Sequence, residues 1–217
     1  MKNYIIFGDT SFAERLAKYI LFEKQDNIVC FTQEDAFCSR DTILGFPVIP
    51  LNKLRENVKV DFEILIAIGY AKMNNLRRQL YNILINAGFK IGTWISNKAI
   101  VYSDKIGEGT IVLPGVVIGP DCQIGKCNFF ESSVVLSHDN QIGDFNFFST
   151  KSVLGGSASV GNHCFLGLHS TIKNGIEIAD LTLIGAGANV LTMTESGGVY
   201  VGNPAKKLLH KSIETKI

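Results

Sequence analysis

The chain has few of the residues that build disulfide and metal sites. It has five cysteines and four histidines in 217 residues, and no two cysteines stand in a C-x-x-C pair. An odd number of cysteines without paired spacing indicates neither a disulfide framework nor a zinc site. We therefore expect no bound metal, and free thiols at Cys30, Cys38, Cys122, Cys127 and Cys164.

Neither sign of charge predominates. Lysine and arginine number 21 against 20 for aspartate and glutamate, and the only basic stretch is the short tail "AKKLLHK". Such a balance predicts no nucleic-acid partner and no membrane surface. The apolar run at the amino terminus is too short for a signal peptide or a membrane span, so we expect a cytoplasmic protein.

Up to about residue 97, apolar runs alternate with helical patterns. Three runs are predicted strands, over residues 4–8, 28–32 and 62–69. Two helices are predicted over residues 12–24 and 74–88, and the first would bury Phe12, Leu16, Ile20 and Leu21. Strand, helix and strand in this order favour a small parallel sheet of the Rossmann-like, nucleotide-binding kind.

From Ile100 onward, an apolar residue recurs at every sixth position up to Val190. Glycine follows the apolar residue in half of these units, and the fifth position is mostly small. A helical repeat is excluded because six is not a multiple of 3.6 and the glycines would each destabilise a helix by roughly 1 kcal/mol. The period therefore predicts a hexapeptide β-helix, and divides the chain into domains at residues 1–97 and 98–217.

Two motifs carry a resemblance to a known family. The "[apolar]-G-x-x-[small]-x" units and the closing "VYVGNPAKKL" are similar to those of hexapeptide-repeat acyltransferases. With a Rossmann-like domain ahead of the coil, the whole chain resembles bacterial sugar acyltransferases, a family that includes sialic acid O-acetyltransferases and N-acetyltransferases of nucleotide-linked 4-amino sugars. The resemblance implies a left-handed β-helix, a homotrimer, and acetyl-CoA bound as co-substrate between adjacent β-helices.

The family's motif "S-H-[DE]-x-x-I-G-[DE]-F" has a match in "SHDNQIGDF", residues 137–145. The resemblance makes His138 the general base and Asp139 the acid that orients it. The chemistry requires such a pair, because an attacking amine must lose a proton and imidazole titrates near neutral pH. With three hexads per coil, Pro120 and Gly156 should stack on either side of His138. His163, His169 and His210 are expected to have structural or solvated positions.

The chain departs from the family where several relatives have a second histidine that contacts acetyl-CoA, because Phe147 stands there. Contact with the thioester is then expected from Asn146 or from the backbone. Asn146 and Phe147 are therefore cofactor-binding candidates, and by the resemblance the CoA groove is lined, largely through backbone, by Gly156, Leu168 and Ala186.

The turn after the first strand reads "FGDTSFAERL". Amide groups at a helix start can hold a phosphate, but this turn lacks G-x-G-x-x-G, which argues against an NAD-dependent reaction. Thr10 and Ser11, followed by Phe12, are candidates for hydrogen bonds to a diphosphate, and either is equally suited to a helix N-cap. The family's usual turn has more glycine, and this difference favours dTDP over UDP.

The resemblance also places three residues near the base of a sugar nucleotide. Thr32 ends the second predicted strand, and Gly69 and Tyr70 end the third. The aromatic ring of Tyr70 is suited to stacking on a base.

The favoured hypothesis is an acetyl-CoA-dependent N-acetyltransferase. Its acceptor would be the C4 amine of a nucleotide-linked 4-amino-4,6-dideoxy sugar, with dTDP as first choice, for surface glycan assembly such as the O-antigen of lipopolysaccharide. An alternative is O-acetylation of sialic acid or another sugar. A β-helix that binds sugar nucleotides without catalysis is a third hypothesis. A carbonic anhydrase is disfavoured, because its zinc needs three convergent histidines.

Overall fold

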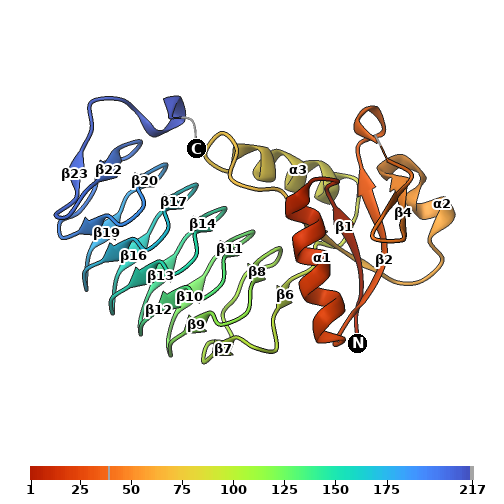
Figure 1. Ribbon diagram of the computed structural model, residues 1–217, viewed down its shortest axis with the longest axis horizontal. Helices are drawn as coiled ribbons and strands as arrows, with labels where there is room; N and C mark the ends of the chain where they lie inside the picture. Colours follow the sequence, from red (N-terminus) through yellow and green to blue (C-terminus); the bar gives the residue numbers. More distant parts are fainter. Residues whose placement is uncertain (39, 216–217) are drawn as a thin grey trace.

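The chain builds a small α/β domain followed by a long left-handed parallel β-helix (Figure 1). The computed structural model describes residues 1–38 and 40–215. The fold class expected from the sequence is thus confirmed. No helix in this described part of the chain is long and apolar enough to cross a bilayer.

The amino-terminal domain is a five-stranded sheet in the order β3-β4-β2-β1-β5. All neighbouring strands in it are parallel except β3 and β4. Its strands are β1 (Asn3–Phe7), β2 (Asn27–Gln33), β3 (Thr42–Ile43), β4 (Phe46–Pro50) and β5 (Glu63–Ile66). Its helices are α1 (Ser11–Glu23), α2 (Leu54–Asn57), α3 (Asn75–Asn86) and the 3-10 turns η1 (Asp35–Phe37) and η2 (Leu51–Lys53). The three expected strands and two expected helices are present, whereas the β3–β4 hairpin and α2 have no counterpart among the expected elements.

The buried face of α1 differs from the expected one. Leu16 and Ile20 are buried as expected, together with Ala13 and Ala17, but Leu21 is exposed. Because each residue advances about 100° around a helix, Leu21 points away from the face that holds Ile20. Phe12 is partly buried at the start of the helix, where it packs on the β-helix.

Three sheets, parallel except for β23, form the β-helix, and we call them faces A, B and C. Face A contains β6 (Trp94–Ile95), β8 (Ile111–Val112), β11 (Phe129–Phe130), β14 (Phe147–Phe148), β17 (Phe165–Leu166), β20 (Leu183–Ile184), β22 (Val199–Val201) and β23 (Lys206–Lys207). Face B contains β7 (Ile100–Val101), β9 (Val117–Ile118), β12 (Val135–Leu136), β15 (Val153–Leu154), β18 (Thr171–Ile172) and β21 (Asn189–Val190). Face C contains β10 (Gln123–Ile124), β13 (Gln141–Ile142), β16 (Ser159–Val160) and β19 (Glu177–Ile178). A 3-10 turn, η3 (Ser212–Glu214), follows the last strand.

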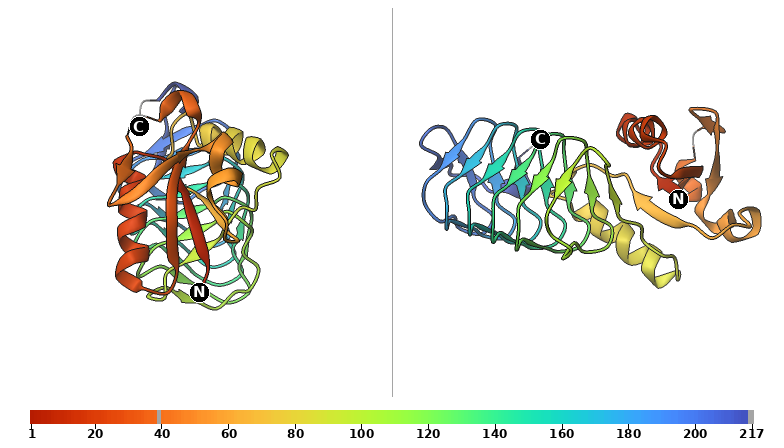
Figure 2. Two further views of the ribbon diagram at one scale, coloured as in Figure 1. Left: turned by 90° about the vertical axis from the view of Figure 1, so that its right-hand side faces the viewer. Right: turned by 90° about the horizontal axis from the view of Figure 1, so that it is seen from below.

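Successive coils stack strand on strand, as the two views of Figure 2 show. The second residue of each two-residue strand points inward, and from Val112 to Val190 all the expected inward residues belong to one buried core. The small residues at the fifth position are buried as well: Thr110, Cys122, Ser152, Ala158, Cys164, Ser170 and Ala188. The six-residue period therefore specifies the interior of the coil correctly.

The first coil departs from the expected phase. Val101, not Ile100, pairs with the inward Ile118, and Ile100 is 52% exposed. This coil is one residue shorter than those that follow, so every side chain in β7 changes face relative to the six-residue count. The β-helix also begins before the expected boundary, because β6 at Trp94 already pairs with β8.

Face A is the face on which the amino-terminal domain packs. Phe129, Phe147 and Phe165 stack in an outward column on it, with centroids 5.3 and 5.7 Å apart. Helix α1 lies between face A and the five-stranded sheet of the amino-terminal domain (Figure 1). Buried residues of the helix, the sheet and the phenylalanine column share one core. The two domains are therefore joined by a continuous apolar interface.

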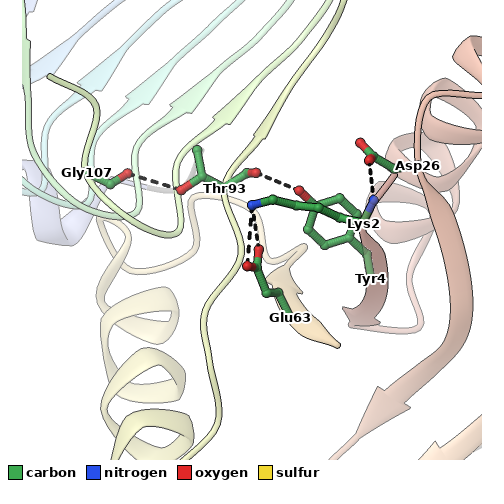
Figure 3. A network of polar contacts seen from close by, with 6 residues as sticks. All are labelled: Lys2, Tyr4, Asp26, Glu63, Thr93 and Gly107. Carbon is green, nitrogen blue, oxygen red and sulfur yellow. Dashed lines mark hydrogen bonds and ion pairs between the residues drawn. The ribbon is translucent and has the colours of Figure 1, made fainter. Parts of the chain in front are cut away.

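Polar contacts close the same interface at its edge (Figure 3). The hydroxyl of Tyr4 donates to the carbonyl of Thr93 at 2.8 Å, and the Thr93 hydroxyl faces the carbonyl of Gly107 at 3.5 Å. Burial raises the pKa of Tyr4, which keeps this hydroxyl a donor. Beside it, Lys2 forms an ion pair with Glu63 at 3.0 Å.

A buried arginine makes the closest link between the domains. Arg77 on α3 is 1% exposed and donates only to oxygens of carbonyl and amide groups. Its acceptors are Cys127 at 3.0 Å, Ile68 and Gly69 at 3.2 Å, Asn74 Oδ1 at 3.1 Å, Phe145 at 3.2 Å and Asn146 at 2.9 Å. Burial lowers its pKa to about 10. The loop after β5 is thus held against two successive coils.

Face B, by contrast, presents apolar side chains that no other element of residues 1–38 and 40–215 covers. Its outward column begins with Ile100, Val117, Val135 and Val153, of which Ile100 is exposed and the valines are half-buried. The outward column of face C is polar, with Gln123, Gln141, Ser159 and Glu177.

Candidate active site

His138 and Asp139 lie together on the corner where face B turns into face C. The imidazole Nδ1 is 2.7 Å from Asp139 Oδ2, and the two side chains are 56% and 55% exposed. Asp139 has a positive φ of 59°, and its amide donates to the carbonyl of Pro120 in the preceding coil at 3.0 Å. The His138 carbonyl accepts from the amide of Ser157 in the next coil at 2.9 Å. The pair is therefore fixed by backbone on both sides while its side chains point outward.

Gly156 makes room for the imidazole. It is the counterpart of His138 in the next coil, and a Cβ on it would overlap Nε2 and Cε1 of His138. Pro120 and Gly156 thus flank His138, as three hexads per coil require. The ring nitrogen that does not face Asp139 lies next to bare backbone.

A cleft of about 630 Å³ lies between the two domains at the other edge of face B. Its lining comes from the start of α1, the loop after β5, face A and the corner where face A turns into face B. The lining residues are Ser11, Phe12, Arg15, Tyr70, Glu131, Phe147, Ser149, Thr150, Phe165, Gly167, Leu168, Leu183, Gly185 and Ala186. Six residues expected to bind substrate or cofactor therefore meet in one place: Ser11, Phe12, Tyr70, Phe147, Leu168 and Ala186.

The floor of the cleft is aromatic. Tyr70 packs edge-on against Phe147 and Phe165, with both centroid distances at 4.9 Å, and Phe12 lies 4.7 Å from Phe129. The side chain of Phe147 is almost fully buried under these contacts. It closes the cleft at the position where the resemblance leads one to expect a second histidine, and it offers a ligand an apolar surface only.

Two residues expected to contact a ligand have side chains that are buried and already bonded. Asn146 is inside the coil, where its amide donates to the carbonyl of Gly161 at 2.9 Å and accepts from the amide of Cys164 at 2.7 Å. The hydroxyl of Thr32 donates to the carbonyl of Ile49 at 2.7 Å and so joins β2 to β4. Neither side chain is available to a ligand at the surface.

The remaining expected residues lie outside the cleft lining. Thr10 is the N-cap residue of α1, and its side chain makes no capping bond. Gly69 has open space around it, and its carbonyl accepts from Arg77. Gly156 contacts His138 on the far side of face B.

The cleft also holds two charged residues that the sequence does not single out. The guanidinium of Arg15 forms an ion pair with the carboxylate of Glu131, whose side chain is 9% exposed against 47% for Arg15. Burial raises the pKa of Glu131, and Arg15 partly offsets that rise. Nothing in the local sequence separates these two from other surface charges.

The other histidines and cysteines have no place in this cleft. His163 stacks on Phe145 with 5.3 Å between centroids, and His169 and His210 are exposed. All five cysteines are free thiols, as expected, and four of them are buried. Within residues 1–38 and 40–215, no three His, Cys, Asp or Glu side chains gather as they would around a metal ion.

A shallow groove of about 700 Å³ runs along face C. It is lined by outward side chains such as Gln123 and Gln141, and it contains none of the residues expected from the sequence to act. The cleft under α1 and the corner of His138 remain the two places where expected site residues gather, and face B separates them.

No protein-family model matches the chain. Among solved structures, it is similar to PerB from Caulobacter crescentus, solved in complex with CoA and GDP-perosamine, with a TM-score of 0.83 and 27% identity over 96% of this chain and 98% of that chain. Two further structures of that perosamine N-acetyltransferase have one histidine replaced by asparagine or alanine.

Two other structures share the fold at lower identity. The acetyltransferase domain of PglB from Neisseria gonorrhoeae has a TM-score of 0.82 and 23% identity, over 96% of this chain and all of that one. WeeI from Acinetobacter baumannii has a TM-score of 0.83 and 22% identity, over 96% of this chain and 100% of that chain. With its hexapeptide coil, its Rossmann-like domain and its likeness to PerB over nearly the whole length, the chain resembles the hexapeptide-repeat sugar acyltransferases.

Proposed function

We propose that the chain is an acetyl-CoA-dependent N-acetyltransferase of a nucleotide-linked 4-amino-4,6-dideoxy sugar, with His138 as general base. The observation that carries the proposal is the His138–Asp139 pair seated on Gly156, in a chain that resembles a perosamine N-acetyltransferase over 96% of its length. The assembly of a surface glycan such as an O-antigen would use the product.

The geometry suits direct transfer between two bound substrates. Asp139 accepts a hydrogen bond from the Nδ1–H of His138, which leaves Nε2 with its lone pair to take a proton from the acceptor. The amine nitrogen attacks the thioester carbonyl, the C–S bond breaks, and CoA leaves as the thiol form after proton transfer. Gly156 lies beside the imidazole, and its backbone N–H would be the donor for the oxygen that becomes negative.

Residues of the amino-terminal domain would hold the acceptor in the cleft. Ser11 is the first residue of α1, where helix N–H groups favour a diphosphate. Phe12 and Tyr70 would pack against the sugar or the base. We keep dTDP as the first nucleotide to test, with UDP and GDP as the alternatives.

The two halves of the site would come from two copies of the chain. His138 and the cleft lie on opposite edges of face B, whose outward column of Ile100, Val117, Val135 and Val153 is uncovered. Apolar surface of this kind favours association. We therefore propose a homotrimer in which His138 of the partner subunit completes each cleft, with acetyl-CoA between adjacent β-helices against Phe147, Gly156, Leu168 and Ala186.

The test is thiol release from acetyl-CoA with dTDP-, UDP- and GDP-linked 4-amino sugars and with sialic acid. Wild type and His138→Ala are compared, because loss of a general base is expected to lower kcat by about a hundredfold or more. Turnover of an amino-sugar nucleotide that falls in the variant supports the proposal. Turnover with sialic acid alone moves the assignment to O-acetylation, and no turnover with any acceptor refutes the assignment to amino sugars.

A further inference from the structure

The cleft contains two charged side chains among its lining residues, Arg15 and Glu131. The rest of its lining is aromatic, aliphatic, glycine or hydroxyl. Charge is expensive in such surroundings unless it is paired. This ion pair is therefore the main polar feature that a ligand in the cleft would meet.

Glu131 is the fixed member of the pair. It lies on the corner between face A and face B, where its amide donates to the carbonyl of Phe148 at 2.9 Å. The backbone N–H of Ser132 and the guanidinium of Arg15 hydrogen-bond to its carboxylate, and burial opposes its charge. A carboxylate in this position requires a cation or a strong donor beside it.

Arg15 is the replaceable member. It projects from α1 one turn after Ser11, with its guanidinium 5.1 Å from the centroid of Phe12, and nearly half of the side chain is exposed. A long side chain at a surface can turn to solvent at little cost. If another cation took its place on Glu131, Arg15 would be free to meet an anionic group near the start of α1.

Resting on the proposed function, we infer that Glu131 binds the amino group of the acceptor and thereby selects an amine over a hydroxyl. The acceptor's ammonium replaces Arg15 on the carboxylate, and Arg15 turns toward the diphosphate. A hydroxyl in the same place donates one neutral hydrogen bond, and the buried carboxylate loses its cation.

The same contact is compatible with reaction. The bound ammonium first gives one proton to solvent, and the resulting neutral amine still donates one N–H to Glu131 while its lone pair faces the thioester carbonyl. The C–N bond forms, the C–S bond breaks, and the proton released from nitrogen passes to His138 of the partner subunit. Glu131 is thus a specificity-determining residue, and the general base is His138 of the partner subunit.

The test measures binding without turnover, in His138→Ala protein by titration calorimetry. Three ligands are compared: dTDP-4-amino-4,6-dideoxyglucose, its 4-hydroxy counterpart and dTDP, or the same set on the nucleotide that the turnover assay selects. Glu131→Gln is expected to weaken binding of the amino sugar by about tenfold or more and that of the other two by less than about twofold. Glu14→Gln removes a carboxylate on α1 that pairs with Arg40 outside the cleft, and should change none of the three.

Equal weakening of all three ligands by Glu131→Gln would assign it a structural role and overturn the inference, as would no change at all. Glu131→Asp, which keeps the charge, should retain the preference for the amine and covers the case in which Glu131→Gln does not fold. The proposed function is judged separately, by turnover in wild type. A wild type that transfers acetyl groups while Glu131→Gln keeps its amine preference would refute this inference alone.

Discussion

The imidazole of His138 occupies the space that a side chain at Gly156 would need. These two residues are counterparts in successive coils, joined through the bond from Ser157 to the His138 carbonyl. The orientation of the His138 ring therefore depends on two contacts, Asp139 on one ring nitrogen and the bare backbone of Gly156 by the other.

Gly156→Ala is the most direct test of that relationship. The added methyl would displace the ring from its rotamer, and kcat should fall by about tenfold to a hundredfold. Circular dichroism and thermal unfolding should show an intact coil. In a His138→Ala background the same substitution should lower kcat no further, and an additive loss there would contradict the assigned contact.

Asp139→Asn should separate the effect of the carboxylate charge from that of the side chain's shape. Asparagine tolerates the positive φ of 59° found at this position, so stability should change by less than about 0.5 kcal/mol. The amide cannot stabilise an imidazolium as a carboxylate does, and it can present N–H to Nδ1 and favour the wrong tautomer. We expect kcat to fall by about a hundredfold with KM little changed, whereas an unaltered kcat would mean that Asp139 does not act on His138.

The two neighbouring arginines of α3 should differ sharply in their effect on stability. Arg77 is buried with six oxygen acceptors from the loop after β5, the start of α3 and the β-helix, whereas Arg78 is exposed. Arg77→Ala removes the guanidinium donor from these buried acceptors and should lower the free energy of unfolding by about 3 kcal/mol or more. Arg78→Ala is the matched control and should stay within about 0.5 kcal/mol. Urea unfolding measures both, and similar values would contradict the assigned role of Arg77.

His163 should make stability depend on pH. Burial, assisted by the positive charges of Arg78 and Arg77, lowers its pKa from the ordinary value of 6.5. The unfolded chain then binds a proton at a pH where the folded chain does not, so stability should fall as pH drops below about 6.5 and continue to fall until the folded pKa is passed.

Replacement by phenylalanine should remove that dependence and keep the ring on Phe145. The difference in slope between wild type and His163→Phe is expected to approach about 1 kcal/mol per pH unit in that window. Urea unfolding at pH 5, 6 and 7.5 gives the two slopes. Parallel curves for the two proteins would show that the titration of His163 does not contribute.

The repeat could be predicted because one six-residue rule fixes the inward residue of every coil after the first. Val112 and Val190 lie at its two ends, and both are buried. The rule failed at Ile100, because the first coil is shorter by one residue and the phase of the repeat changes there. The six-residue pattern does not reveal this change, which is seen only in the pairing of Val101 with Ile118.

The cleft was harder to predict, because its contents depend on how the two domains pack. Thr32 and Asn146 are polar residues at plausible positions, and only the folded chain shows that Ile49 and Gly161 already use them. Glu131 was missed for the opposite reason. In the sequence, a glutamate on a turn resembles a solvated charge, and only the packing of α1 shows that it lies in the cleft. His138 could be predicted from the sequence because the motif that contains it is one continuous stretch of the chain.

Complementation between copies should test whether the cleft and His138 act across an interface. Leu168→Trp adds bulk at the exposed rim of the cleft and should abolish acetyl-CoA binding there, while His138→Ala leaves the cleft intact. If each site uses the cleft of one copy and the base of the next, random trimers of the two inactive variants contain about one quarter of intact sites.

Unfolding and refolding an equal mixture of the two variants should therefore restore up to about 25% of wild-type activity, with each variant refolded alone as the control. Sedimentation should report the mass of three chains. If both halves of a site came from the same copy, no mixed trimer would contain an intact site and the mixture would stay inactive. Activity in the mixture would thus establish both the shared site and the role of face B, because His138 and the cleft lie on its two edges.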